Sequence, residues 1–260
     1  MNKIGLTVAF TFASVFLATR LPAGEVLEDT VEKRFPLAPS GTFSLRTIDG
    51  TVEIFGTDSP EVKIVAVKKA FSPERLNAIA IRVDARQDVV NIETTPPPAP
   101  RHHFLDRSGT VEYIINIPQT ARIARVELPN GELVIDGMRG ASIAASLGSG
   151  QLVTHNCFCD QTIHVNQGGL NVFFDWMEER PISIEAKIED GNLSACLPTD
   201  AAFHMHAVAK QGHVSSDFSP MGTRQRGDDS EINEVIGDGP ATKLTFRAGE
   251  GNIHVSEVIW

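Results

Sequence analysis

Hydrophobic and polar residues alternate in short runs along most of this chain, which is typical of half-buried β-strands. Two of the clearest runs are Val62–Val67 and Val111–Ile117. Turn signals such as Asp49-Gly50 and Asp58-Ser-Pro60 separate the runs. The pattern therefore predicts an all-β protein built from many short strands.

A glycine followed by alternating apolar positions recurs through the second half of the chain. Six copies begin at Gly131, Gly150, Gly168, Gly191, Gly212 and Gly251. Their successive separations are 19, 18, 23, 21 and 39 residues, so the last is close to two periods. A fixed period of this size indicates stacked repeat units, in which each glycine opens a turn or allows close packing. The predicted inward-facing pairs are Leu133 and Ile135, Leu170 and Val172, and Leu193 and Ala195.

One short helix interrupts the strand pattern. Ser72 is a capping residue, Pro73 suits the first helical position, and Glu74 places an acid in the first turn. Leu76 and Ile79 follow at helical spacing, so a helix is expected over residues 73–80. Two turns are marginal in isolation, and we expect packing against the sheet to hold them.

The N-terminal residues 1–24 have the layout of a secretory signal peptide. Lys3 precedes the mostly apolar run Ile4–Ala18, and small residues near Gly24 offer a cleavage site. The run is short for a membrane span, although an uncleaved anchor is the alternative. We therefore predict an exported protein, periplasmic or extracellular, with no transmembrane span after signal cleavage.

Residues 25–260 are predicted to form one β-strand-repeat domain. N-terminal strands and a cap are expected over 25–119, and glycine-strand rungs over 120–260. The glycine-strand pattern is lost between Ser219 and Pro240, which is predicted to be an insertion or a loop.

The chain is acidic, with 23 Lys and Arg against 33 Asp and Glu and a formal net charge of −10. Such a surface repels nucleic acid on average, and no basic patch stands out in the sequence. The predicted partner is an unknown envelope protein or a polysaccharide, and no nucleic acid. Phosphate-binding loops and dinucleotide fingerprints are absent from the sequence, and no cofactor is predicted.

The three cysteines Cys157, Cys159 and Cys196 allow several states. Cys157 and Cys159 would share a strand face, so either could approach Cys196 on a neighbouring rung and form a disulfide. An odd number leaves at least one thiol free. Unpaired cysteines buried as small hydrophobic residues are the alternative, and three thiols alone do not make a closed zinc site.

One cluster is the candidate binding surface: Asp175, Trp176, Glu178 and Arg180, after the Gly168 copy. Acids, a base and an aromatic that could stack on a sugar would suit a polysaccharide lyase or hydrolase of β-helical form. A charged turn with a partly buried aromatic explains the same residues. His204 and His206 could share a strand face as metal ligands, but their spacing alone does not establish a site. We predict no catalytic or metal-binding residues.

Several motifs carry a family resemblance. Tyr113–Pro118, Val126–Ile135 and the closing Gly249–Val255 are similar to a bacterial β-strand-repeat family of unknown function that is labelled "putative adhesin". Asp49–Ile54 also fits, so the resemblance covers roughly residues 40 to 258. It implies a single-domain β-solenoid with an N-terminal β-rich cap, and it supplies no catalytic residues. The predicted function is a non-catalytic exported binding or envelope structural module, with a carbohydrate-active β-helical enzyme as the alternative.

Overall fold

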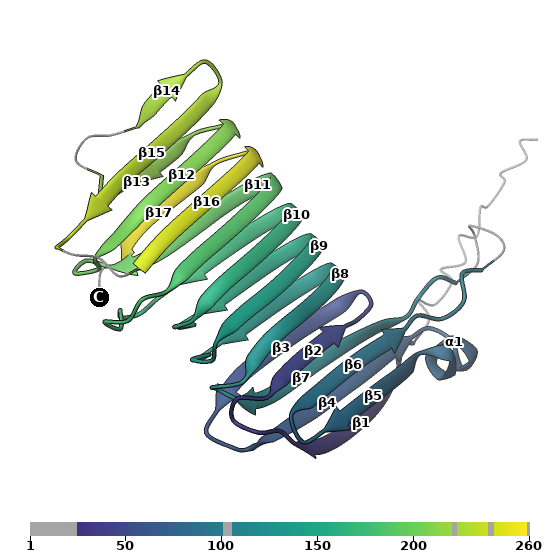
Figure 1. Cartoon of the computed structure of the whole chain (residues 1–260). Coiled ribbons are helices and arrows are strands. Elements are labelled where there is room, and N and C mark those ends of the chain that lie inside the picture. Colours follow the sequence, from purple (N-terminus) through teal and green to yellow (C-terminus); the bar gives the residue numbers. More distant parts are fainter. Residues whose placement is uncertain (1–24, 101–105, 220–222, 239–241, 259–260) are drawn as a thin grey trace, which may run out of the picture.

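The structure is a computed structural model that describes residues 25–100, 106–219, 223–238 and 242–258 (Figure 1). Within these ranges, seventeen strands join into one continuous sheet, accompanied by one short helix. The predicted all-β class with a single short helix is thereby confirmed. The predicted signal peptide at 1–24 lies outside the described residues.

The elements follow one another along the chain with these bounds. The first half contains β1 (Leu27–Pro36), β2 (Thr42–Arg46), β3 (Gly50–Thr57), β4 (Glu61–Ala70), α1 (Pro73–Ala78), β5 (Ala80–Arg86), β6 (Val89–Thr95), β7 (Thr110–Pro118) and β8 (Arg122–Asp136). The second half contains β9 (Ser142–His155), β10 (Asp160–Phe173), β11 (Ser183–Pro198), β12 (Phe203–Gln211), β13 (Val214–Ser216), β14 (Arg224–Arg226), β15 (Asp229–Ile236), β16 (Thr242–Glu250) and β17 (Ile253–Val258).

The centre of the molecule is a stack of parallel strands in register. Strands β8, β9, β10 and β11 each pair with the next, and each contains one of the repeated glycines. We call such a strand, or two consecutive strands separated near the glycine position, a rung. The pairs β2–β3, β12–β13 and β16–β17 are also rungs, since they pair with the same stack (Figure 1).

The repeated glycines lie above one another and form a column through the stack. From one end to the other the column contains Gly50, Gly131, Gly150, Gly168, Gly191, Gly251 and Gly212. Gly50 to Gly191 and Gly251 have φ between +125° and +148°, a region that L side chains rarely adopt. Both predicted roles of the glycine, the unusual backbone and the close packing, are therefore present at the same residue.

The positions two and four residues after each column glycine point into the core. All six residues predicted to face inward are at most 1 % exposed. The connections between rungs supply further buried apolar side chains, including Met138, Phe158 and Phe174. One hydrophobic cluster thus extends through the whole stack.

The rungs do not stack in sequence order at either end. The last rung, β16–β17, lies between β11 and β12–β13, so that Gly251 stands between Gly191 and Gly212. Likewise β2–β3 lies between β6–β7 and β8. The region between Ser219 and Pro240 is predicted from the sequence to be an insertion or a loop. It contains the strands β14 and β15, which extend the sheet antiparallel from β12, so the loop alternative is wrong for these strands.

The helix α1 forms where the sequence predicts it. Ser72 is its N-cap, and its hydroxyl accepts a hydrogen bond from the backbone N–H of Arg75. The helix packs beside β4 and β1 at the end of the molecule far from β14 (Figure 1). In the described ranges, no helix has the length and apolar character needed to cross a membrane.

Candidate binding site at the connecting turns

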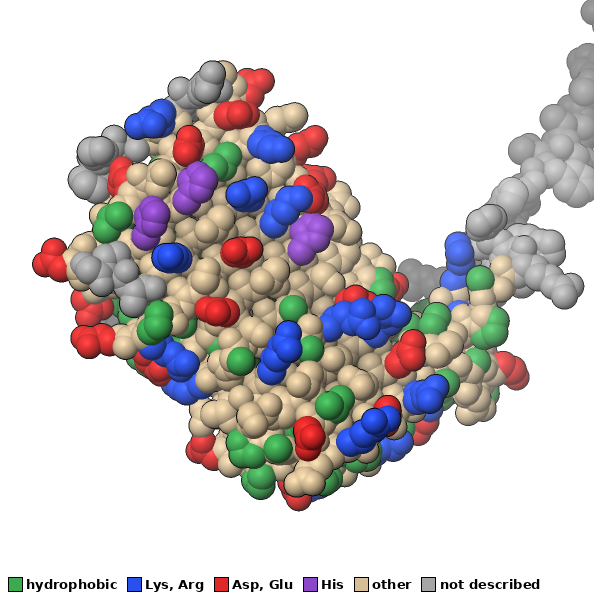
Figure 2. Space-filling view, in the orientation of Figure 1, with side chains coloured by type: hydrophobic (Ala, Val, Ile, Leu, Met, Phe, Trp, Pro, Cys, Tyr) green, Lys and Arg blue, Asp and Glu red, His purple; other side chains and the backbone are tan. Residues whose placement is uncertain are grey.

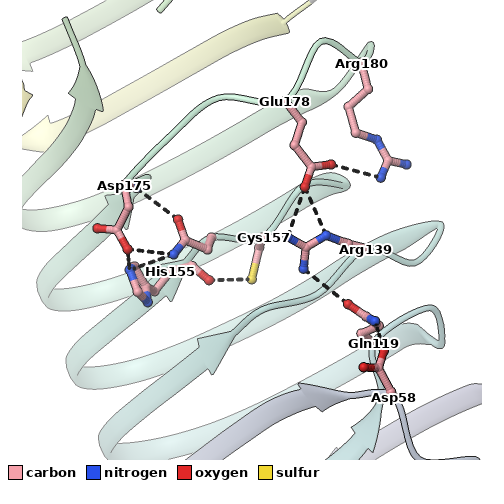
Figure 3. Close-up of polar contacts among 9 residues, drawn as sticks. Asp58, Gln119, Arg139, His155, Cys157, Asp175, Glu178 and Arg180 are labelled. Carbon is pink, nitrogen blue, oxygen red and sulfur yellow. Dashed lines mark hydrogen bonds and ion pairs between the residues drawn. The ribbon is translucent and has the colours of Figure 1, made fainter.

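The four residues of the candidate surface all lie in the connection between β10 and β11. Figure 3 shows Asp175, Glu178 and Arg180 at one edge of the stack. Asp175, Glu178 and Arg180 do not converge on one point. Asp175 joins one polar network, while Glu178 and Arg180 join another. Trp176 lies against an aromatic group beneath the connection.

The first network, which we call the His155 cluster, contains Asp136, His155, Asn156 and Asp175. His155 Nδ1 lies 2.9 Å from Asp136 Oδ1, and His155 Nε2 lies 3.0 Å from Asp175 Oδ2. The Asn156 side chain donates to Asp175 Oδ2 at 2.8 Å and accepts from the Asp175 backbone N–H at 3.0 Å. The cluster thus ties together the ends of three successive rungs.

The second network, the Arg139 chain, runs along the stack from Asp58 through Gln119, Arg139 and Glu178 to Arg180. Arg139 Nε and Nη2 both lie 3.0 Å from Glu178 Oε1, and Arg139 Nη1 donates to Gln119 Oε1 at 3.2 Å. Gln119 in turn donates to the Asp58 carboxylate. Arg180 lies 3.8 Å from Glu178 Oε2. Polar side chains from four separate connections, all charged except Gln119, are therefore held in a line (Figure 3).

Trp176 is supported by a stack of aromatic rings. Its ring centroid lies 5.5 Å from that of Phe158, which lies 5.2 Å from that of Phe174. The Arg139 guanidinium stands 5.2 Å above the Phe158 ring, a cation–π arrangement. Trp176 nevertheless keeps 46 % of its surface exposed. The indole of Trp176 is therefore supported by Phe158 on its inner side. It is open to solvent on its outer side and lies beside the Arg139 chain.

Asp175 and Glu178, the two carboxylates of the candidate surface, belong to separate networks. Asp175 and Glu178 are each occupied by donors of their own network, and no hydrogen bond joins them within the described part of the chain. The exposed indole of Trp176 lies beside these ordered charges.

The histidines considered as metal ligands have other partners. His204 Nε2 lies 3.0 Å from Asn233 Oδ1, and His206 Nε2 lies 3.1 Å from Glu231 Oε1. Among the residues that the structure describes, no group of three His, Cys, Asp or Glu side chains could hold a metal ion.

The three cysteines are free thiols in the structure. Cys157 is buried and donates from Sγ to the carbonyl oxygen of Ile135 at 3.4 Å. Burial raises the pKa of the Cys159 thiol to about 12 and also raises that of Cys157. Cys196 is only half-buried and pairs in register with Phe173. A disulfide to Cys196 stays a prediction for experiment.

Sequence reasoning missed the partners of the candidate residues, namely Asp58, Gln119, Arg139, Asp136 and His155. One signal could have found two of them. Asp136 and His155 each stand five residues after a column glycine, so in-register stacking makes them neighbours. Arg139 and Gln119 lie in connections of irregular length, where counting from the glycine fails.

Comparison with known proteins gives a likeness of fold. No protein-family model matches the sequence, and no curated protein matches it. A solved structure of a putative cell adhesion protein from Clostridium sporogenes superposes with a TM-score of 0.53 at 14% identity, covering 88% of this chain and 100% of that one. A putative lipid binding protein from Parabacteroides distasonis (TM-score 0.37, 9% identity, 89% and 97% covered) and a putative adhesin from Bacteroides fragilis (0.28, 8%, 88% and 97%) are too distant to carry an argument. The first likeness shows the same fold in a protein described as a putative cell adhesion protein, and the expected resemblance to the "putative adhesin" family is confirmed at the level of the fold.

Proposed function

We propose that this protein is an exported, non-catalytic binding module of β-solenoid architecture, which contacts a partner or polymer along the outside of its stack. The observation that supports the proposal most is the packing of Trp176. Its indole is half exposed, yet it rests on Phe158, which packs in turn on Phe174 and beneath Arg139.

A fixed, exposed tryptophan favours binding because little freedom is lost when a ligand covers it. Aromatic side chains offer a large contact area, and tryptophan is enriched at sites that dominate binding energy. Arg139 and Glu178 are held by each other at 3.0 Å, so they are already oriented before a ligand arrives. Such a surface suits the flat face of a sugar ring or an aromatic side chain of a partner protein.

The competing proposal is a carbohydrate-active enzyme on the same edge. It would need Asp175 and Glu178 to act together, whereas the two carboxylates belong to different networks. A purely structural role in the cell envelope is the other alternative, and it requires no free ligand. Export itself rests on the N-terminal pattern of Lys3 and the apolar run Ile4–Ala18.

The test uses the chain from residue 25 onward and a panel of neutral and anionic polysaccharides and envelope extracts. We expect retention of at least one component, weakened about tenfold by Trp176→Ala. Phe71→Ala is the matched control, since Phe71 is 56 % exposed at the other end of the molecule. New reducing ends or unsaturated products would overturn the non-catalytic assignment, and retention equal in all three proteins would exclude Trp176 as the contact.

A further inference from the structure

Strand β1 forms an open edge of the sheet at the end of the molecule far from β14 (Figure 1). Over the described ranges, Leu27–Pro36 pairs along its whole length with β4 and with no other strand. Alternate residues of an edge strand direct their backbone N–H and C=O groups away from the sheet, where another strand can pair with them. This edge is therefore a place at which the sheet can be extended.

The hydrophobic core is incompletely covered at the same end. Val31 and Phe35 of β1 and Ile81 and Val83 of β5 pack against the core but are only half-buried. Figure 2 shows acidic and basic side chains interspersed at this end of the molecule. A strand added at β1 would pair with the free backbone groups and shield these apolar side chains from water.

Lys33 makes this edge unsuitable for an arbitrary strand. It shares the face of β1 on which Val31 and Phe35 pack against the core, and its register partner on β4 is the buried Ile64. Lys33 is exposed and has no ion pair among the described residues. An apolar strand would cover this ammonium group without a counter-charge, which is costly. A suitable partner must therefore bring a carboxylate to the position beside Lys33.

The sequence of β1 supplies that carboxylate itself. If two copies of β1 pair antiparallel about Val31, Asp29 of each copy lies opposite Lys33 of the other. In the same register, Glu28 of each copy lies opposite Arg34 of the other. Side chains directly opposite each other across antiparallel strands are about 5 Å apart, and opposite charges there stabilise the pairing. The charges of β1 are thus complementary to those of a second copy.

The acids of β1 already have bases on one side only. Lys68 Nζ lies 2.5 Å from Asp29 Oδ2, and Lys69 Nζ lies 3.3 Å from Glu28 Oε1, both from β4. The side chains of Asp29 and Glu28 are nevertheless half-exposed. Because a second copy would approach from the side opposite β4, each carboxylate would lie between two bases.

The pattern also selects a single register. A shift of one copy by one residue would set core-facing side chains of one copy beside outward-facing side chains of the other. A centre at any other residue from Glu28 to Arg34 sets at least one like-charged pair face to face. About Thr30, for example, Glu28 meets Glu32. The register about Val31 has no like-charged pair and sets Leu27 opposite Phe35.

We propose that two copies of this chain associate through β1 into a symmetric dimer, with Val31 on the two-fold axis. The sheet continues from one copy into the other, so two stacks join end to end. A second copy fits better than an unrelated strand, because its charged and apolar side chains both match. Since only Leu27–Phe35 pairs in each copy, the interface is small and the dimer is weak and concentration-dependent. This association does not depend on the function proposed for Trp176.

Sedimentation equilibrium of the chain from residue 25 onward, with any tag at the C-terminus, measures the association. We expect a monomer–dimer equilibrium that shifts toward monomer as salt rises. Lys33→Glu turns both Asp29–Lys33 contacts into repulsions, so the dimer dissociation constant should rise about tenfold or more. Lys243→Glu is the matched control, because Lys243 is also an exposed strand lysine without an ion pair in the described ranges. It should change the constant by less than about twofold.

Val31→Cys tests the register, in a Cys196→Ala background that removes the half-buried native thiol. The two introduced thiols would face each other across the axis and should form a disulfide between copies on mild oxidation. Leu27→Cys in the same background is the control. Its two thiols would be eight residues apart along the paired strands, roughly 26 Å, and should not cross-link.

Three results would overturn the proposal. They are a monomer at protein concentrations up to about 0.1 mM, equal effects of Lys33→Glu and Lys243→Glu, and equal cross-linking of the Val31→Cys and Leu27→Cys variants. Circular dichroism of each variant excludes misfolding as the cause. Trp176→Ala should leave the dimer dissociation constant unchanged, so failure at β1 and failure at Trp176 are distinguishable.

Discussion

A Cβ atom on Gly150 would lie 1.9 Å from the carbonyl oxygen of Gly131, its neighbour in the adjoining rung. The obstacle is backbone on which the rung pairing depends, so it cannot move aside as a flexible side chain would. The same relation recurs between Gly168 and Gly150 at 2.0 Å and between Gly191 and Gly168 at 1.9 Å. Glycine is therefore required at these positions both by the short distance between rungs and by the backbone conformation of the turn.

Gly150→Ala should destabilise the stack severely. The substitution combines a φ of +130° with the contact to Gly131, and we expect a loss of at least about 3 kcal/mol in the free energy of unfolding. Gly227→Ala is the control, because its φ is +67° but no atom lies within 4 Å of the added Cβ. It should cost about 1 kcal/mol. Urea unfolding gives both values, and equal losses would show that the close approach between rungs is unimportant.

The three thiols should differ sharply in reactivity. Cys157 and Cys159 are buried, and a pKa of about 12 leaves roughly one Cys159 in ten thousand as thiolate at about pH 8. We expect one thiol per chain of the native protein to react quickly with a thiol reagent. All three thiols should react after denaturation. Cys196→Ala should abolish the fast phase. A native protein with no reactive thiol, or with two, would contradict this structure, and fewer than three after denaturation would reveal a disulfide.

The position of Cys196 illustrates what counting from the glycine can predict. Residues two and four positions after a column glycine point inward, and those three and five positions after it point outward. Cys196 stands five residues after Gly191, in the outward column of His155 and Phe173. The sequence thus contains the information that separates Cys196 from the buried Cys157, although the shared period alone suggests proximity.

The order of the rungs could not be predicted in the same way. A spacing of 39 residues between Gly212 and Gly251 shows that two periods have passed, but not on which side of Gly212 the chain returns. The antiparallel strand β15 reverses the chain direction, which lets β16 enter parallel to β11. The Arg139 chain is equally hidden, because its links from Asp58 to Glu178 join residues 20 to 61 positions apart in irregular connections.

Arg139 should stabilise the edge at which Trp176 lies. Arg139→Ala removes the contacts to Glu178 and Gln119 and the cation–π contact to Phe158, and we expect a loss of about 1 to 2 kcal/mol. Arg139→Lys should restore less than half, because lysine cannot reproduce the planar guanidinium contacts.

A double-mutant cycle with Glu178→Ala measures the pair itself. We expect a coupling of about 0.5 to 1 kcal/mol for Arg139 and Glu178, whose side chains are about one-third exposed. Arg34 and Glu32 form a more exposed pair at 3.5 Å and serve as the control, with a coupling near zero. Equal couplings for the two pairs would refute a special role of the Arg139 chain.

Tyr113, the one tyrosine of the chain, should make stability depend on alkaline pH. Its hydroxyl lies 2.7 Å from Thr94 Oγ1 in the core, and burial raises its pKa to about 12, above the ordinary tyrosine value of 10.0. The native state therefore holds this proton more tightly than the unfolded state. Its contribution of about 2 to 3 kcal/mol is present in full below about pH 10 and is lost as the pH rises to about 12.

Urea unfolding across this pH range, compared with Tyr113→Phe, isolates the effect from lysine titration. The unmodified protein should lose stability more steeply than the variant between about pH 10 and 12, because Tyr113 ionises in its unfolded state there while its native state still holds the proton. Phenolate absorbance of the native protein should likewise rise only near the upper end of that range. Parallel pH profiles for the two proteins, or a phenolate signal at the ordinary pKa, would mean that Tyr113 is open to water in solution.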